Sequence, residues 1–343
     1  MNRKQRRTAA KAARKPAKSG AANAAADNVV AKAIAAARAG ALADAECALD
    51  EVLARFPDHV EALHQKGMLL ARTDRLETGI ALLRRVTAEK PGEALYWNNL
   101  AAACLTVDRF EEACAAARRA VELDPKYAMA WCNLATASTD LGQHRDAVDA
   151  LEAASVLAPK DVDVWNRLGL AHLELGDDAP AETAFAKAVA LAPSNAECLS
   201  NLGVLLAKRG RAGEALSHLE EAVAVEPDRF TAALHYGIVL ASAGDRVKGL
   251  RWLRRATSID PKSDAAWGAL ADAAIVAGDK TEALDAARRA LELAPSDSSH
   301  RARLHMLEPA DGKMIRLDNI SSTDSGRAAE TTLSGSLDRI FIR

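Results

Sequence analysis

Small and apolar residues recur along this chain with a period of 34 residues. In the period that begins at Ala128, the first stripe of such residues includes Trp131, Leu134 and Ala135, and a second stripe includes Ala147 and Leu151. Residues three and four apart lie on the same face of a helix. Each period therefore predicts two amphipathic helices joined by a short polar turn.

Proline fixes the frame of the repeat, because eight of the eleven prolines, from Pro57 to Pro295, are spaced 34 residues apart. A proline ends the helix that precedes it. Counting back from each proline predicts eight helix hairpins without insertions, over residues 26–59, 60–93, 94–127, 128–161, 162–195, 196–229, 230–263 and 264–297. Around this array of 26–297 we expect a basic tail over 1–25, a capping helix over 298–308 and a flexible tail over 309–343.

Three positions of the repeat show how each hairpin closes. Positions 8 and 20 are always Gly or Ala, which predicts a close crossing of the two helices. Position 15 is Gly in six repeats and Asp in the other two, Asp74 and Asp108. Gly readily adopts the left-handed conformation that ends a helix. The predicted turn therefore lies at position 15.

The arrangement W-x-x-L-[GA], G, A, [LF], A, P from Trp165 to Pro193 resembles the tetratricopeptide repeat, and the resemblance covers residues 26–297. It implies an all-α protein: a right-handed superhelical solenoid of eight such hairpins with a C-terminal capping helix. It also implies a scaffold or adaptor that binds other proteins. The sequence departs from the family at position 11, where Ser138 and His172 replace the usual bulky residue.

A ligand surface is expected on the first helices. At about 100° per residue, positions 2, 5, 6, 9, 12 and 13 point away from the packed stripe and line the inner, concave surface of the coil. Position 6 carries a hydrogen-bond donor in six successive repeats, and we call these side chains rungs. The rungs are Gln65, Asn99, Asn133, Arg167, Asn201 and His235.

A side-chain amide can donate to a peptide carbonyl and accept from a peptide N–H, so a series of amides suits an extended backbone of almost any sequence. In this feature, W-N-N-L-A from Trp97 and W-C-N-L-A from Trp131 resemble the repeat region of O-linked N-acetylglucosamine transferase. The rungs are therefore predicted to bind peptide, with Arg167 able to bind a carboxylate. The open alternative is that the asparagines face water or brace the adjacent helix.

Side pockets beside the rungs are expected from further groups on the inner face. These peptide-binding candidates are Asn98, Met129, Thr136, Asn166, Leu170 and Val204.

Catalysis is not expected from the array. The sequence has no phosphate-loop, dinucleotide, H-E-x-x-H or G-x-S-x-G pattern, and its eight histidines fall at unrelated positions of the repeat. We therefore expect no enzyme activity, no metal and no cofactor.

Charge is distributed unevenly. The overall formal charge is −2, but residues 1–26 hold eight Lys or Arg and no acid, which leaves −10 for the rest. Residues 1–18 are interpreted as a solvated tail, as a weak attractor of nucleic acid or anionic membrane, or as a protein-docking segment. The segment holds no aromatic residue that would stack on a base. The five cysteines form no C-x-x-C pair, and no apolar run of about 18 residues occurs, so we expect a cytoplasmic protein.

Two function classes remain open. The first is an adaptor that holds an extended segment of a partner protein. The second is a recruiting subunit for a separate enzyme, such as a glycosyltransferase, or a homo-oligomer that assembles on itself. The apolar end from Leu337 to Arg343 is either a tethered docking motif or a segment that folds back onto the array.

Overall fold

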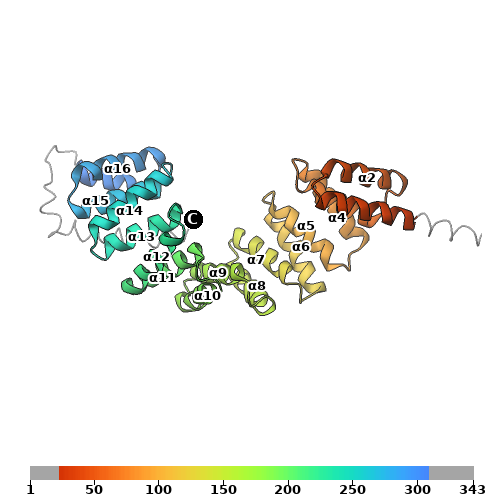
Figure 1. The fold of residues 1–343 in the computed structure, drawn as a ribbon, viewed down its shortest axis with the longest axis horizontal. Coiled ribbons are helices and arrows are strands. Elements are labelled where there is room, and N and C mark those ends of the chain that lie inside the picture. Colours follow the sequence, from red (N-terminus) through yellow and green to blue (C-terminus); the bar gives the residue numbers. More distant parts are fainter. Residues whose placement is uncertain (1–22, 309–343) are drawn as a thin grey trace, which may run out of the picture. The chain divides into compact units, whose positions relative to one another are not determined.

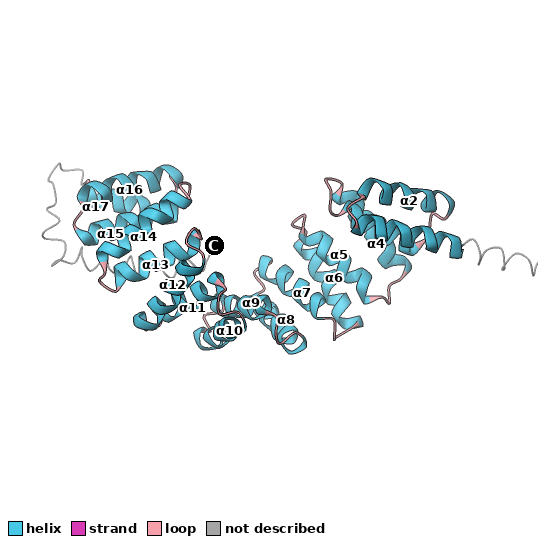
Figure 2. Ribbon diagram, in the orientation of Figure 1, coloured by secondary structure: helices cyan, strands magenta, loops and turns pink. Residues whose placement is uncertain are grey.

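A computed structural model describes residues 23–308 of the chain. Most of the predicted basic tail and all of the predicted C-terminal tail, 309–343, lie outside the described residues. The described part is all-α, as predicted, and Figure 2 shows helices and short loops with no strand in it. It divides into two compact units at the boundary between Ala158 and Pro159, and each unit is described by itself.

The first unit, unit 1, is a stack of antiparallel helix pairs (Figure 1). A helix over residues 23–38 precedes the labelled elements, and Val30, Ala33 and Leu49 belong to the apolar core that joins it to α2. The labelled helices of unit 1 are α2 (Leu42–Arg55), α3 (Val60–Leu70), α4 (Leu76–Glu89), α5 (Ala94–Leu105), α6 (Phe110–Leu123), α7 (Ala128–Asp140) and α8 (His144–Leu157).

The second unit, unit 2, continues the same alternation of first and second helices. Its helices are α9 (Val162–Glu174), α10 (Asp178–Leu191), α11 (Ala196–Lys208), α12 (Ala212–Val225), α13 (Phe230–Ser242), α14 (Arg246–Ile259), α15 (Asp264–Ala277), α16 (Lys280–Leu293) and α17 (Ser298–Leu307).

The small residue at position 8 makes room for the large residue at position 24 of the same repeat. A Cβ placed on Gly169 would lie 2.5 Å from the Phe185 ring, and one on Gly203 would lie 2.7 Å from Leu219. Phe185 and Leu219 are themselves fully buried. A methyl group at position 8 of these repeats therefore requires the facing side chain at position 24 to shift.

Turns between the paired helices follow the position-15 pattern in seven repeats. All six glycines there adopt a positive φ, and Asp108 does so at 56°. Asp74 does not, because α3 already ends at Leu70 and a longer stretch connects it to α4.

The position-4 tryptophans do more than fill space. Each donates its indole N–H to the carbonyl oxygen of the proline that ends the preceding repeat, over 2.9–3.0 Å, as in Trp97 to Pro91 and Trp131 to Pro125. Arg301 of α17 makes the same bond to Pro295 over 2.9 Å. The helix α17 is therefore placed like the first helix of a further repeat.

A buried polar cluster fixes α17 to α15. Arg303 donates from Nε and Nη2 to the two carboxylate oxygens of Asp272, over 2.7 and 2.9 Å, and both side chains are buried. Arg303 also donates to Nδ1 of His300 over 2.8 Å. Gly268 leaves room for this histidine, because a Cβ there would lie 3.0 Å from the imidazole.

Candidate functional site

Three rungs form hydrogen bonds to a residue of the preceding repeat. In unit 1, Asn99 donates to Nε2 of His64 over 2.7 Å, and Asn133 donates to Oδ1 of Asn98 over 2.9 Å. In unit 2, Asn201 donates to Oδ1 of Asn166 over 2.9 Å. In each case position 6 of one repeat bonds to position 5 of the repeat before it. The bonds thus repeat at two successive repeats in unit 1, whereas unit 2 shows one of them.

The two partners in each bond differ in exposure. The acceptors His64, Asn98 and Asn166 are buried, whereas the rungs Gln65, Asn99, Asn133 and Asn201 are half-buried. The prediction that Asn98 and Asn166 line a ligand pocket is therefore wrong. Both side chains are enclosed in the protein, where their amide oxygens accept hydrogen bonds from the rungs Asn133 and Asn201.

Two rungs, Asn133 and Gln65, keep hydrogen-bonding capacity beyond these bonds. A carboxamide offers two N–H donors and two lone pairs on oxygen. Asn133 uses one N–H, and its oxygen has no hydrogen-bond partner among the described residues. Gln65 donates to Glu61 over 2.8 Å and leaves its own oxygen unused within the same part of the chain. The unused groups are those that a peptide backbone requires.

Glu61 and two tyrosines border the series in unit 1. The hydroxyl of Tyr96 donates to Glu61 over 3.5 Å, and the hydroxyl of Tyr127 accepts from Asn98 over 3.1 Å. The neighbouring His64 imidazole and Gln65 amide lower the pKa of the Glu61 carboxyl, against the opposing effect of burial. Burial raises the pKa of Tyr96, and the nearby Glu61 charge adds to this. Glu61 is therefore ionised beside neutral tyrosines.

Two exposed apolar side chains lie one helical turn before the asparagines of unit 1. Leu95 precedes Asn99 by four residues and is 47% exposed, and Met129 precedes Asn133 by four residues and is 61% exposed. Residues four apart are neighbours on a helix surface. We define the amide face of unit 1 as the surface formed by Glu61, Gln65, Leu95, Asn99, Met129 and Asn133.

The remaining candidate in unit 1, Thr136, is half-buried. Its hydroxyl donates to the backbone oxygen of Cys132 over 3.0 Å. It lies three residues after Asn133 and therefore borders the amide face.

In unit 2, the candidate peptide-binding residues are half-buried or buried. Arg167 is half-buried, with Nη1 3.9 Å from a carboxylate oxygen of Asp163, and Leu170 is half-buried as well. Val204 is fully buried and belongs to the apolar core, so its prediction as a ligand contact is wrong.

His235 is also a wrong prediction as an open rung. Its helix α13 carries apolar residues on every side, and His235 is enclosed among them. Burial lowers the pKa of His235 to about 4, and its Nδ1 has no hydrogen-bond partner among the described residues. Position 6 of this repeat therefore does not provide an accessible rung.

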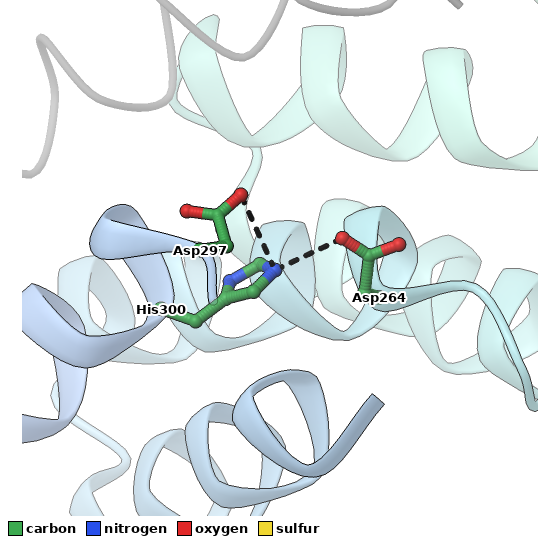
Figure 3. A group of neighbouring side chains, drawn as sticks. All are labelled: Asp264, Asp297 and His300. Carbon is green, nitrogen blue, oxygen red and sulfur yellow. Dashed lines mark hydrogen bonds and ion pairs between the residues drawn. The ribbon is translucent and has the colours of Figure 1, made fainter. Parts of the chain in front are cut away.

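A third group of polar side chains, near the end of unit 2, has the composition of a metal site. Asp264, Asp297 and His300 place ligand atoms within 4.8 Å of one another (Figure 3). However, Nδ1 of His300 accepts from Arg303, so Nε2 carries the proton and donates it to Asp264 over 3.1 Å. A metal ligand needs the lone pair that this proton occupies. We interpret the group as part of the network that attaches α17.

One tetratricopeptide-repeat family model matches residues 30–94, 132–196, 200–264 and 250–298, and a second matches 96–137. The chain is a tetratricopeptide-repeat protein. Such proteins are generally protein-interaction scaffolds. No curated protein matches the sequence of this tetratricopeptide-repeat protein.

Solved structures agree on the fold. A chain of the APC/C hetero-tetramer Cut9–Hcn1 superposes with a TM-score of 0.59 at 17% identity, over 78% of this chain and 52% of that one. A tetratricopeptide repeat protein from Parabacteroides merdae gives 0.59 at 14% identity, over 72% and 98% of the two chains. PilW, a type IV pilus biogenesis factor, gives 0.56 at 20%, over 62% and 98%. At these identities the likeness concerns the fold alone.

Within residues 23–308, no helix combines the length and the apolarity needed to cross a bilayer.

Proposed function

We propose that this tetratricopeptide-repeat protein is a non-enzymatic cytoplasmic scaffold that binds an extended peptide of a partner protein on the amide face of unit 1. The observation that carries the proposal is the bonding of Asn99 to His64 and of Asn133 to Asn98, which holds two half-buried amides at successive repeats. The same face serves a partner that is itself an enzyme, such as a glycosyltransferase.

Preorganisation supports the proposal. Each backbone hydrogen bond contributes only about 1 kcal/mol net, so binding needs several rungs acting together. A rung whose orientation is already fixed loses little conformational entropy when the peptide binds. Because the supporting groups His64 and Asn98 are buried, they hold the amides in place without competing for the ligand.

Apolar contacts add to the amide bonds. Leu95 and Met129 are exposed beside Asn99 and Asn133, and a bound peptide would cover them. Covering apolar surface contributes about 25 cal/mol per Å². Binding therefore rests on backbone recognition by the rungs and on apolar side chains of the peptide.

The domain organisation that we propose follows the repeat frame. It comprises a basic tail over 1–25, eight repeats over 26–297, a cap over 298–308 and a C-terminal tail over 309–343. The five cysteines are unpaired, and three of them are buried, which supports a reducing compartment.

The test begins with peptides selected from a random displayed library on the unaltered chain. Their affinity is then measured for the Asn99→Ala/Asn133→Ala variant and for Asn28→Ala, which removes an exposed asparagine outside the amide face. We expect the double variant to bind at least about 10-fold more weakly, since it loses two or more hydrogen bonds. The Asn28 variant should bind normally, and all three chains should keep their helical circular dichroism. Equal affinity of all three would refute the proposal.

A further inference from the structure

Glu61 is an ionised acid on the amide face that forms no ion pair with a lysine or arginine of residues 23–308. Other acids of unit 1 pair with a cation of a neighbouring repeat. Glu46 pairs with Arg75 over 2.6 Å, and Glu112 pairs with Arg84 over 2.5 Å. The Glu61 side chain is 41% exposed, so its open side is accessible to a cation from solution.

The side chains that contact Glu61 are neutral. Asn99 donates to Nε2 of His64, so the proton of this imidazole is on Nδ1, which lies 3.8 Å from a carboxylate oxygen of Glu61. An imidazole with one proton carries no charge. Gln65 and Tyr96 donate to the same carboxylate over 2.8 and 3.5 Å. These contacts orient the carboxylate but do not neutralise its charge.

Two neighbouring groups strengthen the attraction for a cation. Gln65 donates to Glu61, and its own oxygen has no hydrogen-bond partner among residues 23–308, so it offers a second acceptor beside the carboxylate. Glu93 is exposed at the start of α5. Burial raises the pKa of Tyr96, and the negative charges of Glu61 and Glu93 raise it further. Both carboxylates therefore act on the same part of the face.

The cations of the first helices in unit 1 are placed elsewhere. Lys66 of α3 pairs with Asp50 of α2. Arg72 follows the opposite end of α3, which has 11 residues and is therefore about 16 Å long. The helices α5 and α7 contain no lysine or arginine. The amide face therefore presents a net negative charge at Glu61.

We propose that the peptide bound on the amide face carries a basic residue, Arg or Lys, whose side chain pairs with Glu61. The carboxylate and the oxygen of Gln65 accept its N–H groups, and apolar side chains of the same peptide cover Leu95 and Met129, which are exposed on the next two first helices. A planar guanidinium can donate to both acceptors at once. The inference rests on the proposed function and names the chemistry of the partner segment.

The first experiment repeats the selection from a random displayed peptide library on three full chains: the unaltered chain, Glu61→Gln and Glu89→Gln. Glu89 is exposed on α4 and lies outside the amide face, so it is the matched control. On the unaltered chain and on Glu89→Gln, Arg and Lys should be enriched at least about 3-fold over the unselected library, the size expected for one exposed ion pair. On Glu61→Gln this enrichment should disappear.

The second experiment measures the pairing with one selected peptide by isothermal titration calorimetry. Replacing its basic residue with Gln should weaken binding to the unaltered chain about 5-fold, since one well-placed ion pair is lost. The same replacement should change binding to Glu61→Gln by less than about 2-fold, because the partner charge is already absent. Circular dichroism checks that both chains keep their helices.

Two results overturn the proposal: an enrichment of Arg and Lys that is absent or does not depend on Glu61, or equal losses from the peptide replacement on both chains. The proposed function is read separately from Asn99→Ala/Asn133→Ala. If selected peptides depend on these asparagines but not on Glu61, the scaffold function stands and the assignment of a basic residue fails. If no selected peptide depends on the asparagines, both proposals fail.

Discussion

The buried pair between α15 and α17 gives a prediction about stability. Arg303 is 5% exposed and Asp272 is 1% exposed, and two hydrogen bonds of 2.7 and 2.9 Å join them. Replacing Asp272 with Ala leaves the guanidinium buried with no carboxylate beside it. His300 Nδ1 accepts one further N–H of Arg303 but carries no negative charge that would replace Asp272.

The size of the effect follows from the burial. Removing one partner of a buried ion pair costs about 3–5 kcal/mol, because the remaining charge stays desolvated. Replacing both partners by apolar groups is often close to neutral. We therefore expect Asp272→Ala to lose about 3 kcal/mol or more, and Asp272→Ala/Arg303→Met to recover most of it. The surface pair of Arg289 with Glu292 is the control, and Arg289→Met should cost at most about 1 kcal/mol.

Urea unfolding followed by circular dichroism measures these free energies, and hydrogen exchange locates them. In a repeat array each repeat contacts only its neighbours. Protection from hydrogen exchange should therefore fall in α15, α16 and α17 and stay unchanged in α3. If Asp272→Ala costs less than about 1 kcal/mol, or if the double variant is no more stable than Asp272→Ala, the reasoning about an uncompensated charge is wrong.

Three further predictions concern buried groups. Burial lowers the pKa of His235 from 6.5 to about 4, so between these pH values the unfolded chain binds a proton that the folded protein does not. The free energy of unfolding should therefore fall by up to about 3 kcal/mol as the pH drops through this window. In urea unfolding, His235→Leu should make this decline with pH less steep. Gly169→Ala should destabilise by about 1–3 kcal/mol in the same assay because its Cβ meets a buried ring, whereas Gly213→Ala, which meets nothing within 4 Å, should not. Burial raises the pKa of the Cys104 thiol to about 12, so a thiol reagent should modify exposed Cys47 in the folded protein and Cys104 only after unfolding.

The hairpins could be predicted from the sequence because their determinants are local. Gly169 and Phe185 are 16 residues apart within one repeat, and their sizes follow from how two adjacent helices cross. Proline and glycine mark the ends of these helices for the same local reason. Asp74 is the exception, since a longer connection replaces the expected turn.

Contacts between repeats were harder to predict. The bond from Asn133 to Asn98 spans 35 residues and depends on how two first helices lie side by side, which the position of Asn133 alone does not define. The same limit applies to Arg303 and Asp272. A signal existed in that case, since Arg303 takes position 6 when the 34-residue frame is continued past 297.

His235 shows where the repeat frame misleads. The rule for position 6 treats all first helices as equivalent, with one packed side and one open side. The sequence of α13, Phe-Thr-Ala-Ala-Leu-His-Tyr-Gly-Ile-Val-Leu-Ala-Ser, is apolar on every side, and such a helix is buried. Composition of the whole helix, rather than the position within the repeat, was the better guide here.

The most direct test of peptide recognition follows the side-chain amide signals of Asn99 and Asn133 by ¹H–¹⁵N NMR during titration with a library-selected peptide. If these amides bond to the peptide backbone, both NH₂ pairs should shift and saturate with the bound fraction, while the amide of exposed Asn28 stays in place. Full binding of the peptide with unmoved Asn99 and Asn133 signals would contradict the role assigned to the amide face.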